Sequence, residues 1–454
     1  MASRVMLIAV ALVFSACGGV HPAAPLPASG AHARASDGVN RPDQRDKPHV
    51  ILISFDGFRA DYLDRPDLPN FRLAIQRGAR ARAMLPVFPS LTFPNHYSLV
   101  TGLHPDRHGI VANSFYDPVR NQRYALSDRA AVTDGTWYRG QPIWVTAETQ
   151  GMVSACFFWP GSEAAIGGVR PTFWNAYEDS VSNSERVDGV LRWLQLPDER
   201  RPHVITVYFS EVDSASHDGP LSTPEVTQAL RSLDRALGSL LDGVNALSIR
   251  DRVYLVLTSD HGMVETNASQ TVALDSIVDM TGVRVGFAGP VTSLHIAGGA
   301  ARASEVRNQL NSRLQHGRAY LREDLPHRFR FSADPRAGDV VVVMDESWTL
   351  SASRVTQLAN RVRRRWGAHG WDPALPSMHA MFLVVGPGIR PGATVEEVNN
   401  VDVYPFLTEL LGLQPAPEID GRAGWIGARV MDPAGEGVRR TTLHPAPGGS
   451  YIGQ

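Results

Sequence analysis

Each of three apolar runs in this chain is followed by side chains that can bind a metal ion or move a proton. The residues are Asp56 after run 50–55, Asp213 and His217 after run 204–209, and Asp260 and His261 after run 253–258. Short apolar runs that are rich in β-branched residues and lack alternation are typical of buried parallel strands. Because the functional crevice of such a sheet lies at the carboxyl ends of its strands, we expect these five side chains to converge on one edge.

A sixth candidate, His379, precedes a fourth apolar run at 381–386, and His369 is a less favoured alternative nearby. Three aspartates and three histidines supply the oxygen and nitrogen ligands that zinc accepts. The set is sufficient for two ions with three side chains each. Two metals about 4 Å apart can activate an attacking oxygen and stabilise charge on a phosphoryl group. Turn-forming aspartates and surface histidines would explain each residue singly, but not the whole set at strand ends.

A candidate nucleophile lies in residues 92–96, which read Thr-Phe-Pro-Asn-His. A proline suits the first turn of a helix and a threonine suits its cap, so we expect a helix to start here with Thr92 as the cap. A hydroxyl at that position faces unpaired N–H groups and the positive end of the helix dipole, which stabilise an alkoxide or a phosphate. A helix cap without a catalytic role is the alternative for this threonine taken alone.

From about residue 48 to about 415 the chain resembles the nucleotide pyrophosphatase/phosphodiesterase family of the alkaline phosphatase superfamily. The matching segments, in the family's order, are Ser54–Arg59, Pro89–Tyr97, Thr101–Asn113, Phe157–Glu163, Tyr208–His217 and Thr258–Met263. The resemblance implies an α/β fold, an alkaline-phosphatase-like α/β/α sandwich with a mainly parallel central sheet. We expect the catalytic domain to cover 48–431, with a smaller inserted subdomain at about 265–370.

The resemblance also implies the roles of the candidate residues. It assigns one zinc ion to Asp213, His217 and His379, and a second to Asp56, Asp260, His261 and the Thr92 hydroxyl. Thr92 would then be the nucleophile that forms a covalent phospho-threonine intermediate. Asn113 and the backbone N–H of Phe93 would donate hydrogen bonds to a non-bridging phosphate oxygen.

For the leaving group, the resemblance implies a slot for a nucleobase. Its lining would be Phe93, Trp159 and Tyr177, with Leu126 and Tyr208 adding to it. Aromatic faces stack on any base and discriminate little, but Glu163 could accept a hydrogen bond from the exocyclic amine of adenine. Ordinary core packing is the alternative for Trp159 and Tyr177.

The expected activity is hydrolysis of nucleotide phosphodiester or pyrophosphate bonds with release of nucleoside 5′-monophosphates. A hydrolase of choline-type phospholipid head groups or of phosphonates is a second hypothesis, with a cage for a quaternary ammonium in place of the slot. A third is a zinc-binding surface lipoprotein without activity. A sulfatase is disfavoured, because residues 92–96 match neither end of the Cys/Ser-x-Pro-x-Arg motif that those enzymes resemble.

The first residues predict export. Residues 1–17 have a charged start and an apolar core too short to span a bilayer, and end in a lipobox-like sequence at Cys17. A periplasmic or outer-membrane lipoprotein of a bacterium is therefore expected, with 18–47 as a flexible tether and 432–454 as a loose tail. Cys156 is the only other cysteine, so an internal disulfide framework and cysteine zinc sites are excluded. With a net charge of −2 and no polybasic run, a monomer acting on a small anionic substrate is expected, not a binder of polymeric nucleic acid.

Other segments predict structural elements. Apolar residues at helical spacing from Val226 to Val244, after Thr223-Pro224-Glu225, predict a capped helix packed against the sheet. Residues 401–412 predict a closing helix of the main fold. Within the inserted subdomain, 292–296 and 339–344 predict strands, and we expect His295 to be structural.

Overall fold

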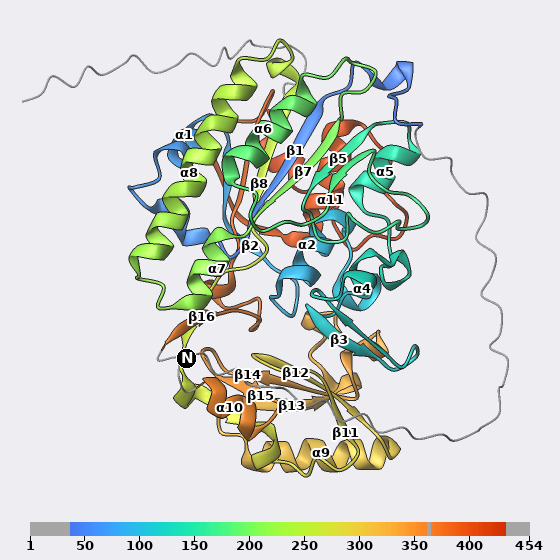
Figure 1. The fold of residues 1–454 in the computed structure, drawn as a ribbon, viewed down its shortest axis with the longest axis vertical. Coiled ribbons are helices and arrows are strands. Elements are labelled where there is room, and N and C mark those ends of the chain that lie inside the picture. The colour runs from blue at the N-terminus through green and yellow to red at the C-terminus, as the bar shows by residue number, and fades with distance from the viewer. Residues whose placement is uncertain (1–36, 361–364, 433–454) are drawn as a thin grey trace, which may run out of the picture. The chain divides into compact units, whose positions relative to one another are not determined.

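The computed structural model of the chain describes residues 37–360 and 365–432, and the side chains of 359 and 360 are not described. Within these residues eight strands form one sheet in the order β18-β2-β17-β8-β1-β7-β5-β6 (Figure 1). Their bounds are β1 His49–Phe55, β2 Ala79–Leu85, β5 Ser154–Phe157, β6 Phe173–Asn175, β7 Val204–Phe209, β8 Val253–Thr258, β17 Phe382–Val385 and β18 Ala393–Asn399.

The centre of this sheet is parallel, as the apolar runs predicted. Strand β1 pairs in parallel with β7 on one side and with β8 on the other, and every residue of the three strands is buried. Strand β17, from the fourth apolar run, is antiparallel to both β8 and β2. Its amino end therefore lies beside the carboxyl ends of the parallel strands.

Helices cover both faces of the sheet (Figure 1). One face carries α1 (Pro69–Arg77), α6 (Asn183–Leu194) and α8 (Pro224–Asn245), and the other carries α2 (Thr92–Thr101), α5 (Ile143–Thr149) and α11 (Val403–Leu411). Successive residues of β1 alternate between two cores, Ile51 and Ile53 facing the first helices and Val50 and Leu52 facing the second. The α/β/α sandwich expected from the resemblance is confirmed.

Two helices were foreseen from their sequence patterns. The stripe from Val226 to Val244 lies on the buried face of α8, and α11 falls within the predicted 401–412. Thr223 precedes α8, but its side chain makes no capping hydrogen bond, so the predicted cap is not formed. Burial of the apolar stripe therefore accounts for this helix better than its cap does.

A smaller body of structure lies between β8 and β17. In the described residues it holds a four-stranded sheet, β11-β12-β14-β13, with α9 (Gly299–Arg313) packed on it. The strands are β11 Val283–Phe287, β12 Val291–Ile296, β13 Gly317–Leu321 and β14 Val340–Met344, so both predicted strands are present. Smaller elements around it are β9 Val264–Thr266, β10 Thr271–Ala273, β15 Thr349–Ser351, α10 Arg354–Asn360 and β16 Trp366–Ala368.

The hairpin of β3 (Ser114–Asp117) and β4 (Gln122–Ala125) joins this body to the main fold. Arg336 is buried and donates from Nε to Asp117 Oδ2 at 2.8 Å, and from Nη1 to the carbonyl of Trp137. Arg123 reaches the carbonyls of Val285 and Gly286 from the same hairpin. His295 packs edge-on against Tyr116 of β3, in agreement with its expected structural role.

The described part of the expected tether is docked on the domain. Asn40 is buried, its amide donates to the carbonyls of Asp198 and Arg201, and its Oδ1 accepts from the N–H of Val153. The prediction of a flexible tether is thus wrong at Asn40, because this side chain binds the loop before β7 and the residue before β5. The expected signal segment, Cys17 and nearly all of the expected tail lie outside the described residues. Across 37–360 and 365–432, no helix combines the length and hydrophobicity needed to cross a membrane.

Candidate metal and catalytic site

Three aspartates meet at the carboxyl edge of the parallel strands. Asp56 follows β1, Asp260 follows β8, and Asp213 lies in α7 (Glu211–Asp218), directly after β7. Gly57, at φ +68°, makes this approach possible, because a Cβ there would lie 3.1 Å from the Cα of Asp213. The N–H of Gly57 also donates to Asp260 Oδ1 at 3.1 Å.

One oxygen of each carboxylate is buried and lacks a hydrogen bond, although Asp213 as a whole is partly exposed. Among the described residues these atoms are Asp56 Oδ1, Asp213 Oδ1 and Asp260 Oδ2. The second oxygen is held in two cases: Tyr208 donates its hydroxyl to Asp56 Oδ2 at 2.6 Å, and Gly57 holds Asp260 as described. Buried polar atoms without partners are costly unless another group binds them, so these oxygens are suited to cations.

Three histidines face the carboxylates with their Nε2 atoms. His261 Nε2 lies 2.9 Å from Asp260 Oδ2 and 3.6 Å from Asp56 Oδ1. His217 and His369 place Nε2 at 3.3 and 3.6 Å from Asp213 Oδ1. In each ring Nδ1 lies 2.8–2.9 Å from a backbone carbonyl, that of Gly262, Gly367 or Ser90. A carbonyl at Nδ1 fixes the proton there and leaves Nε2 as the ligand atom, the usual arrangement around zinc.

His369, and not His379, completes the cluster with Asp213 and His217. Strand β16, which ends at Ala368, pairs antiparallel with β9, which begins at Val264 shortly after His261. This pairing stacks the rings of His369 and His261 with centroids 3.6 Å apart. The sequence did not predict this contact, because no apolar run precedes His369 and because β9, the partner of β16, lies about a hundred residues earlier in the chain.

The assignment of His379 as a metal ligand is wrong for a local reason. Its carbonyl accepts from the N–H of Ala60 at 3.0 Å, and its half-buried ring lies outside every ligand group of the described residues. Burial lowers the pKa of His379, and the one charge that opposes this effect is Glu397 on the edge strand β18. The preceding Met378 packs with Trp371 and Val264.

The electrostatics of the cluster favour cations. Burial, together with the charges of Asp260 and Asp213, raises the pKa of Asp56 well above its usual range. Burial lowers the pKa of His261, but the charges of Asp260 and Asp213, together with hydrogen bonds to Asp260 and Gly262, outweigh it, and the net effect is a raised pKa. Carboxylates that repel one another are groups that a divalent cation would stabilise.

Thr92 lies beside this cluster, with Oγ1 3.3 Å from His261 Nε2. It is the first residue of α2, where Leu91 is the cap residue and no side chain caps the helix. The predicted capping role is therefore wrong, although the predicted position at the helix start is confirmed. The hydroxyl contacts His261 instead of the helix N–H groups.

His96 lies under the site without being a ligand. It belongs to a group with Asp56 and Asp260 by distance, but both ring nitrogens are engaged, Nδ1 with the carbonyl of Thr92 at 2.9 Å and Nε2 with Ser54 Oγ at 2.8 Å. Its ring therefore ties the first turn of α2 to strand β1, and positions Thr92.

The two expected phosphate donors contact each other. The N–H of Phe93 donates to Asn113 Oδ1 at 2.8 Å, so this N–H is not available to a phosphate and that prediction is corrected. The contact orients the amide of Asn113, whose Nδ2 makes no hydrogen bond within the described residues. Of the two expected donors, Asn113 keeps its N–H groups free within the described residues and the N–H of Phe93 does not.

Two of the expected slot residues are structural. Trp159 is 1 % exposed, donates Nε1 to the carbonyl of His96 at 3.2 Å and packs edge-on against its ring, so core packing is the correct interpretation. Tyr208 is buried, and its hydroxyl orients Asp56. Neither ring presents a face to solvent.

The other slot residues are accessible. Leu126 and Tyr177 are 45 % and 42 % exposed, and Phe93 is half-buried. Leu126 donates its N–H to the carbonyl of Asn113 at 3.0 Å, and Leu126 therefore lies next to Asn113, the residue expected to hydrogen-bond the phosphate. Glu163 is buried and paired with Arg129, a partner that the sequence did not reveal.

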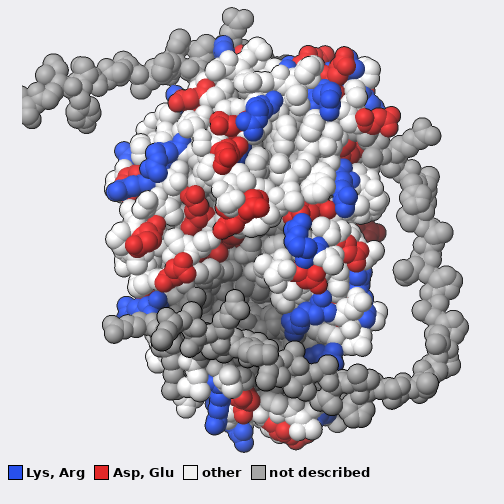
Figure 2. All heavy atoms as spheres, viewed as in Figure 1, with Lys and Arg blue, Asp and Glu red and all other residues white. Residues whose placement is uncertain are grey.

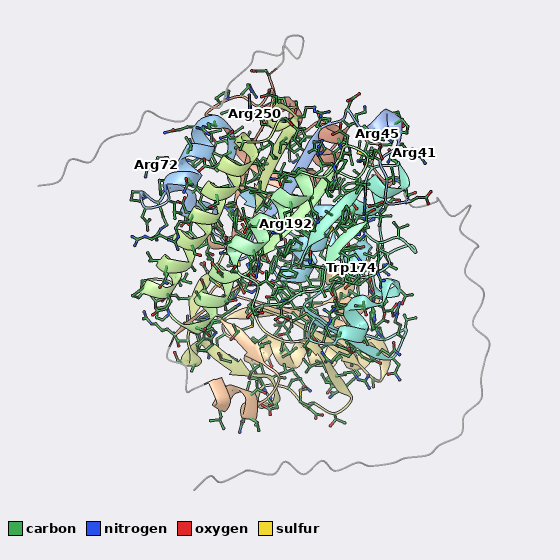
Figure 3. The ribbon with its side chains drawn as sticks, turned by 45° about the horizontal axis from the view of Figure 1, so that its top comes forward. Arg41, Arg45, Arg72, Trp174, Arg192 and Arg250 are labelled. Carbon is green, nitrogen blue, oxygen red and sulfur yellow. The ribbon has the colours of Figure 1, made fainter. Side chains whose placement is uncertain are left out.

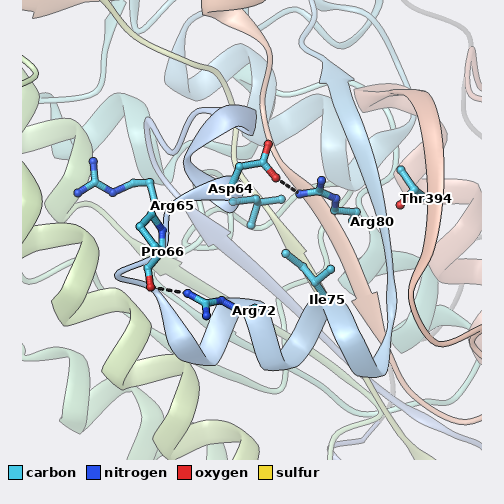
Figure 4. A pocket seen from close by; sticks show the side chains of 8 residues that line it. Asp64, Arg65, Pro66, Arg72, Ile75, Arg80 and Thr394 are labelled. Carbon is cyan, nitrogen blue, oxygen red and sulfur yellow. Dashed lines mark hydrogen bonds and ion pairs between the residues drawn. The ribbon is translucent and has the colours of Figure 1, made fainter.

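A hollow of about 440 Å³ lies elsewhere, between α1 and the strands β2 and β18 (Figure 4). Its lining is Leu63, Asp64, Arg65, Pro66, Arg72, Ile75, Arg80 and Thr394. The charges there are largely satisfied, since Arg80 pairs with Asp64 at 2.7 Å and Arg72 donates to the carbonyl of Pro66. The candidate site residues do not line it.

Fold and site together define the class. An α/β sandwich with carboxylates and histidines at the carboxyl ends of its parallel strands, beside a hydroxyl at a helix start, is an alkaline-phosphatase-like fold with a metal-dependent hydrolytic site. The family model of type I phosphodiesterase / nucleotide pyrophosphatase matches residues 50–372. The chain belongs to this family.

Relatives and solved structures agree with this family. Human ectonucleotide pyrophosphatase/phosphodiesterase family member 1 is 36 % identical over 418 residues, and a venom phosphodiesterase of Macrovipera lebetinus is 34 % identical over 409 residues. Each alignment covers 88 % of this chain but 44 % and 47 % of the relative, so the chain spans about half the length of these relatives. The structure of an inactive murine ectonucleotide pyrophosphatase/phosphodiesterase 5 with AMP superimposes with a TM-score of 0.78 at 30 % identity, covering 85 % of this chain and 100 % of that one.

Proposed function

We propose that the chain is a two-zinc phosphodiesterase and nucleotide pyrophosphatase, which releases nucleoside 5′-monophosphates through a covalent phospho-threonine at Thr92. The observation that carries the proposal is the position of Thr92 Oγ1, 3.3 Å from His261 Nε2, which itself lies 2.9 Å from Asp260 Oδ2 and 3.6 Å from Asp56 Oδ1. The AMP bound to murine member 5 of the family and the names of the relatives support a nucleotide substrate.

The residues fit two ions with three side chains each. Asp213, His217 and His369 would hold one, and Asp56, Asp260 and His261 would hold the other together with the Thr92 hydroxyl. Imidazole Nε2 atoms fixed by their Nδ1 partners, together with carboxylates, are the donor set that zinc prefers. When bound, the ions would stabilise the alkoxide of threonine and the charge that develops on the phosphoryl oxygens.

The chain's own groups then position the reaction. Thr92 Oγ1 would bond to phosphorus as the bond from phosphorus to the leaving oxygen breaks, and water would later cleave the threonine ester and restore the hydroxyl. Nδ2 of Asn113, turned by the N–H of Phe93, would donate to a non-bridging oxygen. On the face drawn in Figure 2, acidic and basic side chains are interspersed, which suits a small substrate better than a nucleic-acid polymer.

The test compares hydrolysis of p-nitrophenyl thymidine monophosphate with that of p-nitrophenyl phosphate, with and without a chelator. The diester is expected to be preferred, and activity should vanish with the chelator and in Thr92→Ala, with partial recovery in Thr92→Ser. Thr223→Ala, at the start of α8, is the matched control and should retain full activity. Acid-quenched wild type should carry a nucleotidyl mass on the peptide containing Thr92.

The other outcomes decide against the proposal. A preference for the monoester would contradict it, and a preference for choline esters would favour the lipid head-group hydrolase. Bound zinc without any turnover would favour a binding protein without activity.

We also propose export with a lipid anchor at Cys17, supported by the sequence of residues 1–17 and by relatives named as ectoenzymes or found in venom. Fractionation of cells that express the full chain should find it with membranes, and Cys17→Ser should release it. A cytoplasmic wild-type chain would contradict this proposal.

A further inference from the structure

The carboxylate of Glu163 accepts three hydrogen bonds from protein donors, which leaves about one of its four acceptor sites. Its Oε1 accepts from Arg129 Nη1 at 2.9 Å and from the N–H of Tyr177 at 3.3 Å, and its Oε2 accepts from Arg129 Nη2. The residue is 5 % exposed. It therefore has little capacity left to accept a hydrogen bond from a ligand.

The pair adjoins both exposed residues of the expected slot, Leu126 along the chain and Tyr177 through a hydrogen bond. Arg129 is the first residue of α4 (Arg129–Thr133), three positions after Leu126, and Asp128 caps this helix through the N–H groups of Ala130 and Ala131. Because Arg129 and the backbone of Tyr177 donate to the same oxygen, the guanidinium is next to Tyr177. A base bound between Leu126 and Tyr177 would therefore have the guanidinium as its neighbour.

The accessible group of the pair is the cation. The side chain of Arg129 is 55 % exposed against 6 % for that of Glu163. Hydrogen bonds to Glu163 raise the pKa of Arg129, so the guanidinium stays charged. Its Nε makes no hydrogen bond within the described residues, and a guanidinium offers donors only.

From this geometry we propose that the Arg129–Glu163 pair selects nucleotides whose base carries a keto oxygen, guanine above all, over those with an exocyclic amine. Guanidinium donors fit O6 and N7 of guanine together and can reach O4 of uracil or thymine. Adenine and cytosine present an NH₂ donor at the same position, where it meets another donor. The sequence-based expectation of an adenine preference through Glu163 is thereby reversed.

The inference rests on the proposed function, because it concerns the base of the nucleotide that this site would bind. The test is calorimetric binding of GMP, AMP, UMP and CMP to the zinc-loaded wild type, with kcat/KM for GTP and ATP as a second readout. GMP should bind more tightly than AMP, and UMP more tightly than CMP, by about fivefold or more for a partly exposed pair of hydrogen bonds.

Variants separate selectivity from structural support. In Arg129→Gln the preference should fall to within about twofold, and Arg129→Lys, which retains the charge without the planar fork, should keep only part of it. A purely structural role would weaken all four nucleotides equally and leave their ratios unchanged. Arg192→Gln is the matched control, since Arg192 is exposed on α6 and forms no ion pair within the described part of the chain (Figure 3).

The binding and turnover results distinguish a failure of the base-selectivity inference from a failure of the proposed function. Equal or tighter binding of AMP than GMP by the wild type, or an unchanged ratio in Arg129→Gln, overturns this inference, while nucleotide turnover that depends on Thr92 leaves the proposed function intact. Absence of both nucleotide binding and nucleotide turnover would overturn both.

Discussion

Strands β1 and β7 have histidines beside their amino ends and aspartates beyond their carboxyl ends, and the two ends behave differently. At the amino end His49 and His203 stack with ring centroids 4.4 Å apart and planes within 5°. Their Nδ1 atoms lie 2.9 Å from the carbonyls of Pro202 and Pro48. At the carboxyl end, histidines bound to carbonyls in the same way face Asp56, Asp213 and Asp260.

The comparison of the two strand ends shows that a buried histidine becomes a candidate metal ligand only where carboxylates lie beside it. The amino-end pair offers two nitrogens and no carboxylate, fewer than the three protein ligands of a zinc site. Burial, followed by the charge of His203, lowers the pKa of His49 to about 3, so the stacked pair is neutral and structural. The surrounding carboxylates, not the orientation of the rings, distinguish the candidate metal site.

The largest expected effect comes from Asp56→Asn at the carboxyl end. Activity should fall by more than the roughly 10- to 100-fold typical of residues that only support a metal ligand. In chelator, however, the free energy of unfolding should rise by about 1 kcal/mol, because one of three mutually repelling buried carboxylates is neutralised. Initial rates and urea denaturation measure the two effects, and activity within tenfold of wild type would argue against a ligand role.

A smaller effect is expected for Tyr208→Phe, which removes the hydroxyl that holds Asp56 Oδ2 and leaves the ring in place. Zinc affinity or activity should fall by about 10- to 100-fold, the range for groups that orient a ligand. Zinc titration against a competing chelator measures the affinity. Tyr62→Phe, at a half-buried tyrosine whose ring packs on Phe58, serves as the control. Equal losses in both variants would contradict the orienting role.

At the amino end, His203→Phe should change stability and not activity. The substitution keeps a stacked ring but leaves the carbonyl of Pro48 without its donor, which should lower the free energy of unfolding by about 1–3 kcal/mol. Specific activity of the folded protein should stay within about twofold of wild type. A large loss of activity at unchanged zinc content would show that the two ends are coupled.

The pH dependence of the free energy of unfolding should reflect the buried, neutral pair of His49 and His203. The pKa of His49 is about 3 in the folded protein and near 6.5 when unfolded, so the unfolded state binds more protons between these values. The contribution is complete above about pH 6.5 and is lost as the pH falls toward 3, at up to about 1.4 kcal/mol per pH unit. Urea denaturation of the chelated protein at pH 7 and pH 5 should show a larger loss for wild type than for His49→Gln; equal losses would refute the assignment.

The sequence predicted the parts of the site that local pattern determines. Asp56, Asp213 and Asp260 each follow a buried strand, and parallel pairing brings the carboxyl ends of the neighbouring strands β7, β1 and β8 together at one edge. The same rule cannot identify His369, because its position depends on the pairing of β16 with β9 across the inserted residues. The proximity of His379 to a strand was misleading for the same reason, since adjacency along the chain does not determine where a ring points.

Contacts between side chains that are distant in the chain also could not be predicted from the sequence. The burial of Trp159, the hydrogen bond from Tyr208 to Asp56 and the pairing of Glu163 with Arg129 join residues that share no periodic pattern. Likewise, the bond between the N–H of Phe93 and Asn113 replaced two expected phosphate donors by one. Residue types indicated the chemistry, while tertiary packing decided which atoms remain available for it.

Zinc stoichiometry in two histidine variants tests the central claim most directly. After dialysis against buffer without metal, wild type and His379→Ala should each retain two zinc ions per chain by atomic emission, and His369→Ala should retain one. Loss of an ion in His379→Ala with two ions kept in His369→Ala, or a wild type that binds none, would contradict the account.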